Sequence, residues 1–113
     1  MHEVSLAGGI LQVVEQTRVR DPFARVMHLT LEVGALSGVE VSSLRFALQA
    51  ISHDTCLAGA EIEIQEPSAT AWCLPCGQSV PIHDRLDLCP LCGSAQLQAT
   101  SGTELRVLDL RVI

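Results

Sequence analysis

The sequence carries two short, matching stretches, CLPCG at residues 73–77 and CPLCG at residues 89–93. Each holds two cysteines separated by two residues and followed by glycine, and together they supply Cys73, Cys76, Cys89 and Cys92. This spacing lets both sulfurs of a pair reach one ion, and the glycine can adopt the left-handed conformation that turns N–H groups toward the thiolates. We therefore predict a four-thiolate zinc site, structural rather than catalytic because it leaves no open coordination position.

Two other assignments compete for these cysteines. The second stretch resembles a rubredoxin knuckle, but Trp72 is the only aromatic residue nearby, and a colourless purified protein would exclude iron. Disulfides are disfavoured because we expect a cytoplasmic location, where thiols stay reduced. That expectation rests on the absence of a basic segment typical of secretory signals and on an apolar run, residues 4–14, too short to span a membrane.

Composition limits the protein further. Its 113 residues suffice for one modest core plus a small metal-stapled module. The formal net charge is −6 and the sequence has no lysine, so we expect neither a nucleic-acid partner nor an anionic membrane surface. The fifth cysteine, Cys56, has no catalytic partners in view and is expected to be a small buried apolar group. We therefore do not expect an enzyme.

Hydrophobic periodicity predicts the elements around the cysteine pairs. Apolar residues at helical spacing indicate a helix that ends near Arg20 and a second helix whose apolar face carries Val41, Leu44, Leu48 and Ile51. Alternation indicates strands over residues 25–33, 61–65 and 104–113. The fold class that follows is α+β, with two helices packed on a three-stranded sheet and a zinc-ribbon-like module between the second and third strands.

This order divides the chain into two domains. Residues 1–68 and 100–113 would form the α+β domain, and residues 69–99 the zinc-binding domain. Ser37 followed by Glu40 fits a capping box at the start of the second helix.

The first three residues, Met1-His2-Glu3, suggest a second metal site. A histidine at position 2 brings together three nitrogens: the terminal amine, its own backbone amide and its imidazole. These can fill three corners of a square plane, and Glu3 could add an oxygen. Such geometry suits Ni(II) or Cu(II), and spacing alone does not choose between them. We expect His2 and Glu3 to precede the first helix.

Three features together resemble the HypA/HybF family of nickel-incorporation proteins. They are the opening Met1-His2-Glu3, the two cysteine pairs late in the chain, and a Gly-x-Glu-Leu-x-x-Leu segment over residues 102–108. The resemblance covers essentially the whole chain. It implies a metallochaperone for the maturation of nickel–iron hydrogenase, with transient Ni(II) and structural Zn(II).

The resemblance also implies particular residues and partners. The nickel ligands would be His2 and Glu3, and Glu40 matches an acidic position beside the nickel site in relatives, a role that competes with helix capping. The implied partners are a HypB-type GTPase, the hydrogenase large-subunit precursor and, in some organisms, urease maturation proteins. The alternative from another class is a zinc-ribbon module that binds protein or nucleic acid without any nickel function.

Overall fold

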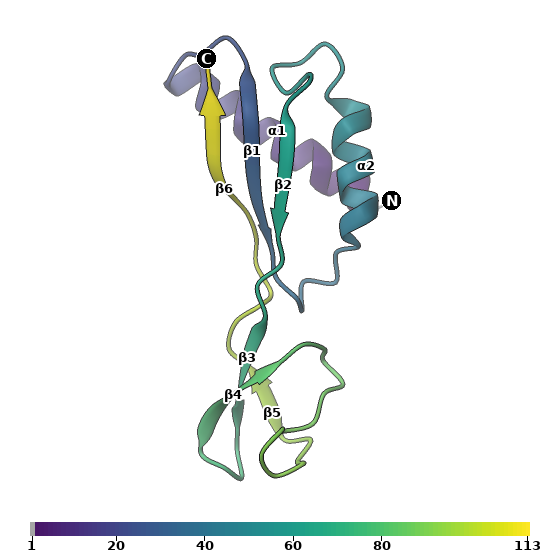
Figure 1. The fold of residues 1–113 in the computed structure, drawn as a ribbon, viewed down its shortest axis with the longest axis vertical. Helices are drawn as coiled ribbons and strands as arrows, with labels where there is room; N and C mark the ends of the chain where they lie inside the picture. The colour runs from purple at the N-terminus through teal and green to yellow at the C-terminus, as the bar shows by residue number, and fades with distance from the viewer. Residues whose placement is uncertain (1) are drawn as a thin grey trace. The chain divides into compact units, whose positions relative to one another are not determined.

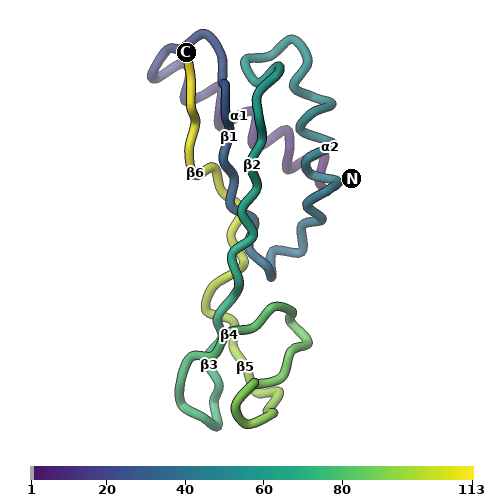
Figure 2. The backbone as a smooth tube through the Cα atoms, viewed as in Figure 1, coloured from purple at the N-terminus to yellow at the C-terminus, as the bar shows by residue number. Residues whose placement is uncertain are grey.

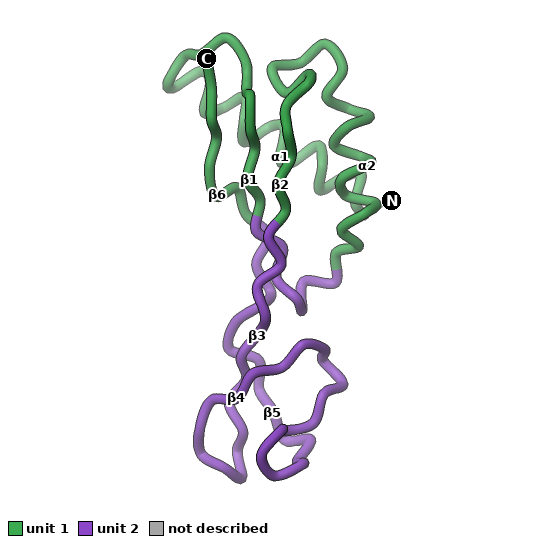
Figure 3. Tube along the Cα trace, in the orientation of Figure 1, with its two compact units in different colours: residues 1–31, 39–64, 106–113 green, residues 32–38, 65–105 purple. Residues whose placement is uncertain are grey.

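The computed structural model describes residues 2–113, and their contacts divide them into two compact units. Unit 1 comprises residues up to 31 together with 39–64 and 106–113, and unit 2 comprises residues 32–38 and 65–105 (Figure 3). Among the described residues, no helix has the length and apolarity needed to cross a bilayer.

One sheet and two helices make up most of unit 1. The elements are α1 (His2–Arg20), β1 (Val26–Val33), α2 (Val41–Ile51), β2 (Glu61–Gln65) and β6 (Leu105–Val112). The strands are ordered β2-β1-β6, so the last strand in the chain pairs with the first. Figure 1 shows α1 crossing behind this sheet. The predicted α+β class, with two helices and a three-stranded sheet, is confirmed.

The core of unit 1 comes from aliphatic side chains of all these layers. Leu29 and Leu31 of β1, Val14 of α1, and Leu44 and Leu48 of α2 have essentially no solvent exposure. Burying one such side chain contributes about 1.5–3 kcal/mol. This unit therefore has an apolar core of its own.

Unit 2 contains a second, smaller sheet that the periodicity did not reveal. Its strands are β3 (Ala69–Cys73), β4 (Gln78–Ile82) and β5 (Leu97–Ala99), in the order β4-β3-β5. Both pairings are antiparallel, and Cys73 pairs with Gln78 in one and with Leu97 in the other. Figure 2 shows the chain running from β2 into β3 and returning from β5 to β6. In the sequence, the cysteine module therefore comes between β2 and β6, which are the second and third strands of the larger sheet in chain order, as predicted.

The first helix begins earlier than expected. We expected His2 and Glu3 to precede it, but α1 starts at His2 although Gly8 and Gly9 lie in its N-terminal half. Glycine in a helix costs only about 0.5–1 kcal/mol relative to alanine. The buried side chains of Ala7 and Ile10 flank the two glycines and hold this turn against the core.

Two glycines allow a close backbone crossing within unit 2. The N–H of Gly34 donates to the carbonyl of Glu104 at 2.8 Å, and the N–H of Leu36 donates to the carbonyl of Gly102 at 2.7 Å. A Cβ on Gly34 would lie 2.2 Å from the Gly102 carbonyl oxygen, and Gly102, with φ of +94°, has Ala69 against it. The Glu104 carboxylate accepts from the Gly102 N–H at 3.0 Å, which explains the Gly-x-Glu spacing of this segment.

Replacing Gly34 with alanine should therefore destabilise the protein. The new methyl group meets backbone rather than a movable side chain, and overpacking of this kind costs about 1–3 kcal/mol. Gly9→Ala is the matched control, because a Cβ there meets nothing within 4 Å and should add about 0.5–1 kcal/mol. Urea denaturation measures both, and equal stability of the two variants would contradict the crossing.

Candidate metal centres

The four paired cysteines converge in unit 2. Their sulfur atoms all lie within 4.8 Å of one another, with Cys73 Sγ 3.6 Å from Cys92 Sγ and Cys76 Sγ 3.9 Å from Cys89 Sγ. A tetrahedral zinc with Zn–S bonds near 2.3 Å places its sulfurs about 3.8 Å apart. No other group of three or more metal-ligating side chains gathers this closely within residues 2–113. The donor set and its spacing therefore fit one tetrahedral ion.

The two knuckles share one local geometry. The Gly77 N–H donates to the Cys73 carbonyl and the Gly93 N–H to the Cys89 carbonyl, each at 2.8 Å. Both glycines have positive φ, +64° and +76°, as the sequence predicted. In the second knuckle the N–H of Leu91 also points at Cys89 Sγ, at 3.4 Å. The second turn thus presents a sulfur and an N–H group to each other.

The thiols of this cluster have opposed pKa shifts. Burial raises the pKa of Cys89, but the N–H groups of Cys92 and Leu91 and the neighbouring thiols outweigh it and lower the pKa to about 6. The thiols of Cys92 and Cys73, with burial, raise the pKa of Cys76 to about 12. One thiolate therefore forms readily, while the raised pKa of Cys76 penalises a second. A bound cation would remove that penalty and ionise all four.

The apolar core around the cysteines is small. Cys73 and Cys89 are buried in one cluster with short or branched side chains, and that cluster's buried members are Leu36, Ala69, Ala71, Cys73, Val80, Ile82 and Cys89. It contains no aromatic residue and a single leucine, and modules with so little apolar surface usually need a metal or another staple to fold.

His2 and Glu3 lie together in the first turn of α1. The His2 Nδ1 is 3.6 Å from Glu3 Oε2, and their side chains are 64% and 23% exposed. The same carboxylate oxygen accepts from the backbone N–H of Glu40 at 3.3 Å. The start of α1 and the start of α2 therefore meet at Glu3. The amine of Met1, which the sequence also suggested as a ligand, lies outside the described residues.

Glu40 is the N-cap of α2. Its Oε2 accepts from the backbone N–H of Ser43 at 2.7 Å. The predicted capping box, with Ser37 as the cap and Glu40 inside the helix, is wrong, because the turn through Gly38 (φ of +76°) leaves Ser37 outside α2. The backbone N–H of Glu40 donates to the Glu3 carboxylate. Glu40 therefore both caps α2 and neighbours the candidate nickel ligands.

Both carboxylates have lowered pKa values. Hydrogen bonds from backbone N–H groups, chiefly that of Glu40, lower the pKa of Glu3, and those from Ser43 lower the pKa of Glu40. Two anionic groups therefore stand at the N-termini of two helices, where the helix dipoles are positive. This is an oxygen-rich, negatively charged surface beside an exposed imidazole.

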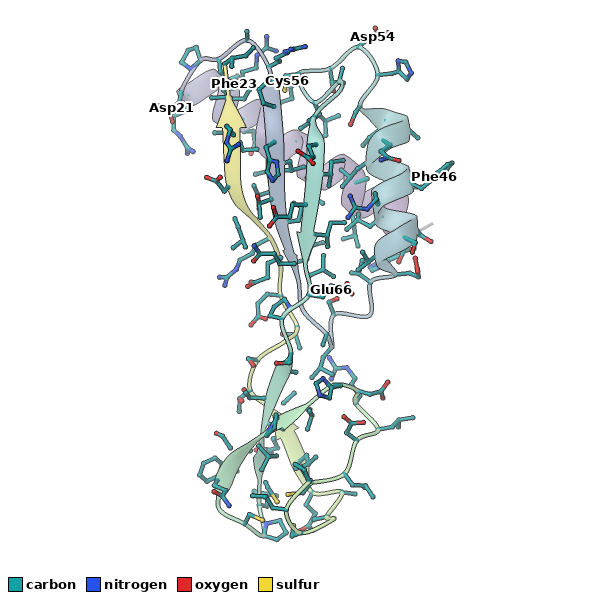
Figure 4. The ribbon with its side chains drawn as sticks, in the orientation of Figure 1. Asp21, Phe23, Phe46, Asp54, Cys56 and Glu66 are labelled. Carbon is teal, nitrogen blue, oxygen red and sulfur yellow. The ribbon has the colours of Figure 1, made fainter. Side chains whose placement is uncertain are left out.

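The remaining candidates belong to neither group of residues. His28 on β1 is flanked by Glu61 and Glu63, with ring nitrogens 3.4 Å and 3.1 Å from their carboxylates. His83 is exposed in the cysteine loop. Cys56 is buried in unit 1 (Figure 4), where burial and its hydrogen bond to Glu15 raise the pKa of the thiol to about 11. Cys56 is therefore an unreactive thiol.

The fold and the two groups of residues define a small α+β protein with a four-cysteine knuckle centre. The family model described as hydrogenase/urease nickel incorporation, metallochaperone, HypA, matches residues 1–112. The chain belongs to the HypA family of nickel-incorporation metallochaperones in hydrogenase maturation. This confirms the resemblance noted in the sequence.

Individual relatives match this chain over nearly its whole length. It is 57% identical over 112 residues to the hydrogenase maturation factor HypA of Cupriavidus necator, covering 99% of this chain and 94% of that one. The corresponding factor of Polaromonas naphthalenivorans is 55% identical, with 99% and 97% covered. The solution structure of the Ni metallochaperone HypA from Helicobacter pylori superimposes with a TM-score of 0.69 at 18% identity, over 98% and 97% of the two chains. That structure supports the fold.

Replacing Glu40 tests its place as the cap. Glu40→Ala removes the acceptor of the Ser43 N–H and should lower the thermal midpoint, whereas Glu40→Asp should keep most of the stability because aspartate caps well. The pKa of Glu40 is lowered from 4.5 by its hydrogen bonds with Ser43. The stability that this ionised cap contributes is therefore present above pH 4.5 and is lost as the pH falls through the lowered pKa. Thermal melts should therefore separate parent from Glu40→Ala at pH 7 and converge in acid. A constant difference at every pH would contradict the role.

Proposed function

We propose that this chain binds Ni(II) through His2 and Glu3 at its N-terminus and delivers the ion, with a HypB-type GTPase, to the nickel–iron hydrogenase large-subunit precursor. The observation that carries the proposal is the juxtaposition of the His2 imidazole and the Glu3 carboxylate at the exposed start of α1. The family description supports nickel as the cargo, where donor geometry alone allows copper as well.

The helix start supplies a further donor and sets an electrostatic requirement. Backbone N–H groups in the first turn have no partner within their own helix, so the amide nitrogen of His2 is free to join the imidazole and the Met1 amine in a square plane. A cation there also faces the positive ends of α1 and α2. The Glu3 and Glu40 carboxylates offset that repulsion, whether or not Glu40 itself touches the ion. An exposed terminus can release its cargo readily.

We propose that the second centre holds a resident zinc ion, with Cys73, Cys76, Cys89 and Cys92 as its ligands. A four-thiolate zinc neutralises the crowded sulfurs and fixes the two knuckles without offering a reactive position. The corresponding division is a nickel-binding domain of residues 1–68 and 100–113 and a zinc-binding domain of residues 69–99, although contacts also group residues 32–38, 65–68 and 100–105 with the cysteine module.

The zinc assignment predicts the behaviour of cysteine variants. The Cys76→Ala, Cys92→Ala double variant should lose the one zinc per chain and unfold residues 71–94, because the module's own core is small. The core of unit 1 should persist, so much of the helical circular dichroism should remain. Metal analysis and hydrogen exchange measure both effects. Full zinc content in the double variant would refute the ligand set, and the Cys56→Ala control should keep its zinc.

The nickel assignment predicts a separate loss. His2→Ala should abolish specific Ni(II) binding in a calorimetric titration while zinc content and helicity stay unchanged, because the His2 side chain is largely exposed. A residue added before Met1 should also weaken binding by converting the amine to an amide, whereas the same addition after Ile113 should be harmless. Glu3→Gln should have a smaller effect, since the nitrogens remain.

His28→Ala is the matched control, because that histidine lies among carboxylates on β2 and should not affect nickel. Nickel binding by His2→Ala at the parent's affinity would show that the site lies elsewhere.

A further inference from the structure

The two cysteine knuckles differ at one position of an otherwise shared turn. The third residue of each Cys-x-x-Cys-Gly segment is Pro75 in the first knuckle and Leu91 in the second, where the proline, Pro90, stands one position earlier. Both turns are closed by the same hydrogen bond, from the glycine N–H to the carbonyl of the first cysteine, at 2.8 Å in each. Pro75 therefore occupies the place in its turn that Leu91 occupies in the other.

This third position faces a ligand sulfur. The N–H of Leu91 donates to Cys89 Sγ at 3.4 Å, and the N–H of Cys92 faces the same sulfur. In the first knuckle the N–H of Cys76 faces the sulfur of Cys73 in the same way, but the proline at the third position has no N–H to donate. The sulfur of Cys73 therefore lacks one backbone donor that the sulfur of Cys89 has.

The missing donor bears on metal binding. A hydrogen bond to a thiolate stabilises its negative charge and fixes its direction, so it helps the sulfur to hold a cation. Removing one such outer partner of a metal ligand typically lowers metal affinity about 10–100-fold. Pro75 and Pro90 are both exposed, so neither proline ring is part of the apolar core of the module. The backbone donor is the difference that remains between the two turns at this position.

We propose that Pro75 sets the zinc affinity of this chain by withholding an N–H from Cys73, and that the first knuckle is therefore the half of the site that opens first when the ion is exchanged. The inference rests on the proposed zinc site and its four ligands. Pro75 touches no metal itself and acts through the Cys73 sulfur, so it is a positioning residue.

Two matched substitutions isolate the missing N–H. Pro75→Ala restores a donor at the third position, and Pro90→Ala is the control. Each replaces an exposed knuckle proline by alanine, so both variants gain similar freedom in the unfolded chain. The N–H created at position 90 corresponds to that of Leu74, which donates to the carbonyl of Gln96 rather than to a sulfur.

Competition for zinc with a chromophoric chelator measures the affinities. Pro75→Ala should bind zinc about tenfold more tightly than Pro90→Ala, because only the first variant adds a donor to a ligand sulfur. Equal affinities, or tighter binding by Pro90→Ala, would overturn the proposal.

A spectroscopic measurement separates the hydrogen bond from any other effect of losing a proline ring. With an NMR-active cadmium isotope in place of zinc, coupling between the metal and an amide proton reports an N–H that donates to a ligand sulfur. The parent should show this coupling at the amide of Leu91. Pro75→Ala should gain it at position 75, and Pro90→Ala should show none at position 90. Absence of coupling at position 75 would refute the role of the missing N–H.

Thiol labelling during removal of zinc by the chelator tests which knuckle opens first. Arg85 lies between the knuckles, so trypsin places them on separate peptides. Cys76 should be alkylated before Cys92, although Cys92 is the more exposed of the two. Pro75→Ala should reduce the lag between them. Alkylation of Cys92 first in the parent would show that exposure, and not the hydrogen bonds, decides the order.

Failure of this inference is distinct from failure of the zinc assignment. If the Cys76→Ala, Cys92→Ala double variant kept its zinc, the ligand set would fall, and the role of Pro75 would fall with it. If that double variant lost its zinc while Pro75→Ala and Pro90→Ala bound zinc equally, the ligand set would stand and only the role of Pro75 would fall.

Discussion

Repulsion among four crowded sulfurs once they ionise to thiolates is the constraint on which unit 2 depends. The separations of 3.6 and 3.9 Å between sulfurs of the two knuckles match a tetrahedral metal, and without a cation the pKa of Cys89 is lowered while that of Cys76 is raised. The apolar cluster around them is small, so a metal would supply the cohesion that a larger core supplies elsewhere. We therefore expect a metal at this centre to stay bound, with no open coordination position.

The proposed cargo site has the opposite requirements, and unit 1 meets them with different chemistry. Its core is complete without any ion, so a metal can arrive at and leave His2 without unfolding the protein. Nitrogen and carboxylate donors at an exposed helix start suit a transient ion, and four clustered thiolates suit a permanent one. Glu40 links the stability of unit 1 to the proposed nickel site, because its side chain caps α2 and its backbone N–H donates to the Glu3 carboxylate.

The sequence predicted what is encoded locally and missed what depends on packing. The spacing of the cysteine pairs and Gly77 and Gly93 gave the knuckles, because a four-residue turn fixes its own geometry. The start of α1 was placed too late, since Ala7 and Ile10 stabilise a turn that glycines weaken. The capping residue was misplaced because Ser37 and Glu40 have the right spacing but Gly38 turns the chain between them. The groove lined by Val4 of α1 and Phe46 of α2 has no local signal, because its two sides are far apart in the sequence.

Nickel and zinc should occupy two chemically distinct sites on this one chain. X-ray absorption spectroscopy of the protein loaded with one Ni(II) and one Zn(II) tests it most directly, because each edge reports its own ligands. The nickel edge should show only nitrogen and oxygen neighbours, with the outer-shell scattering of an imidazole. The zinc edge should show four sulfurs near about 2.3 Å. Sulfur at nickel, or nitrogen and oxygen in place of sulfur at zinc, would contradict the account.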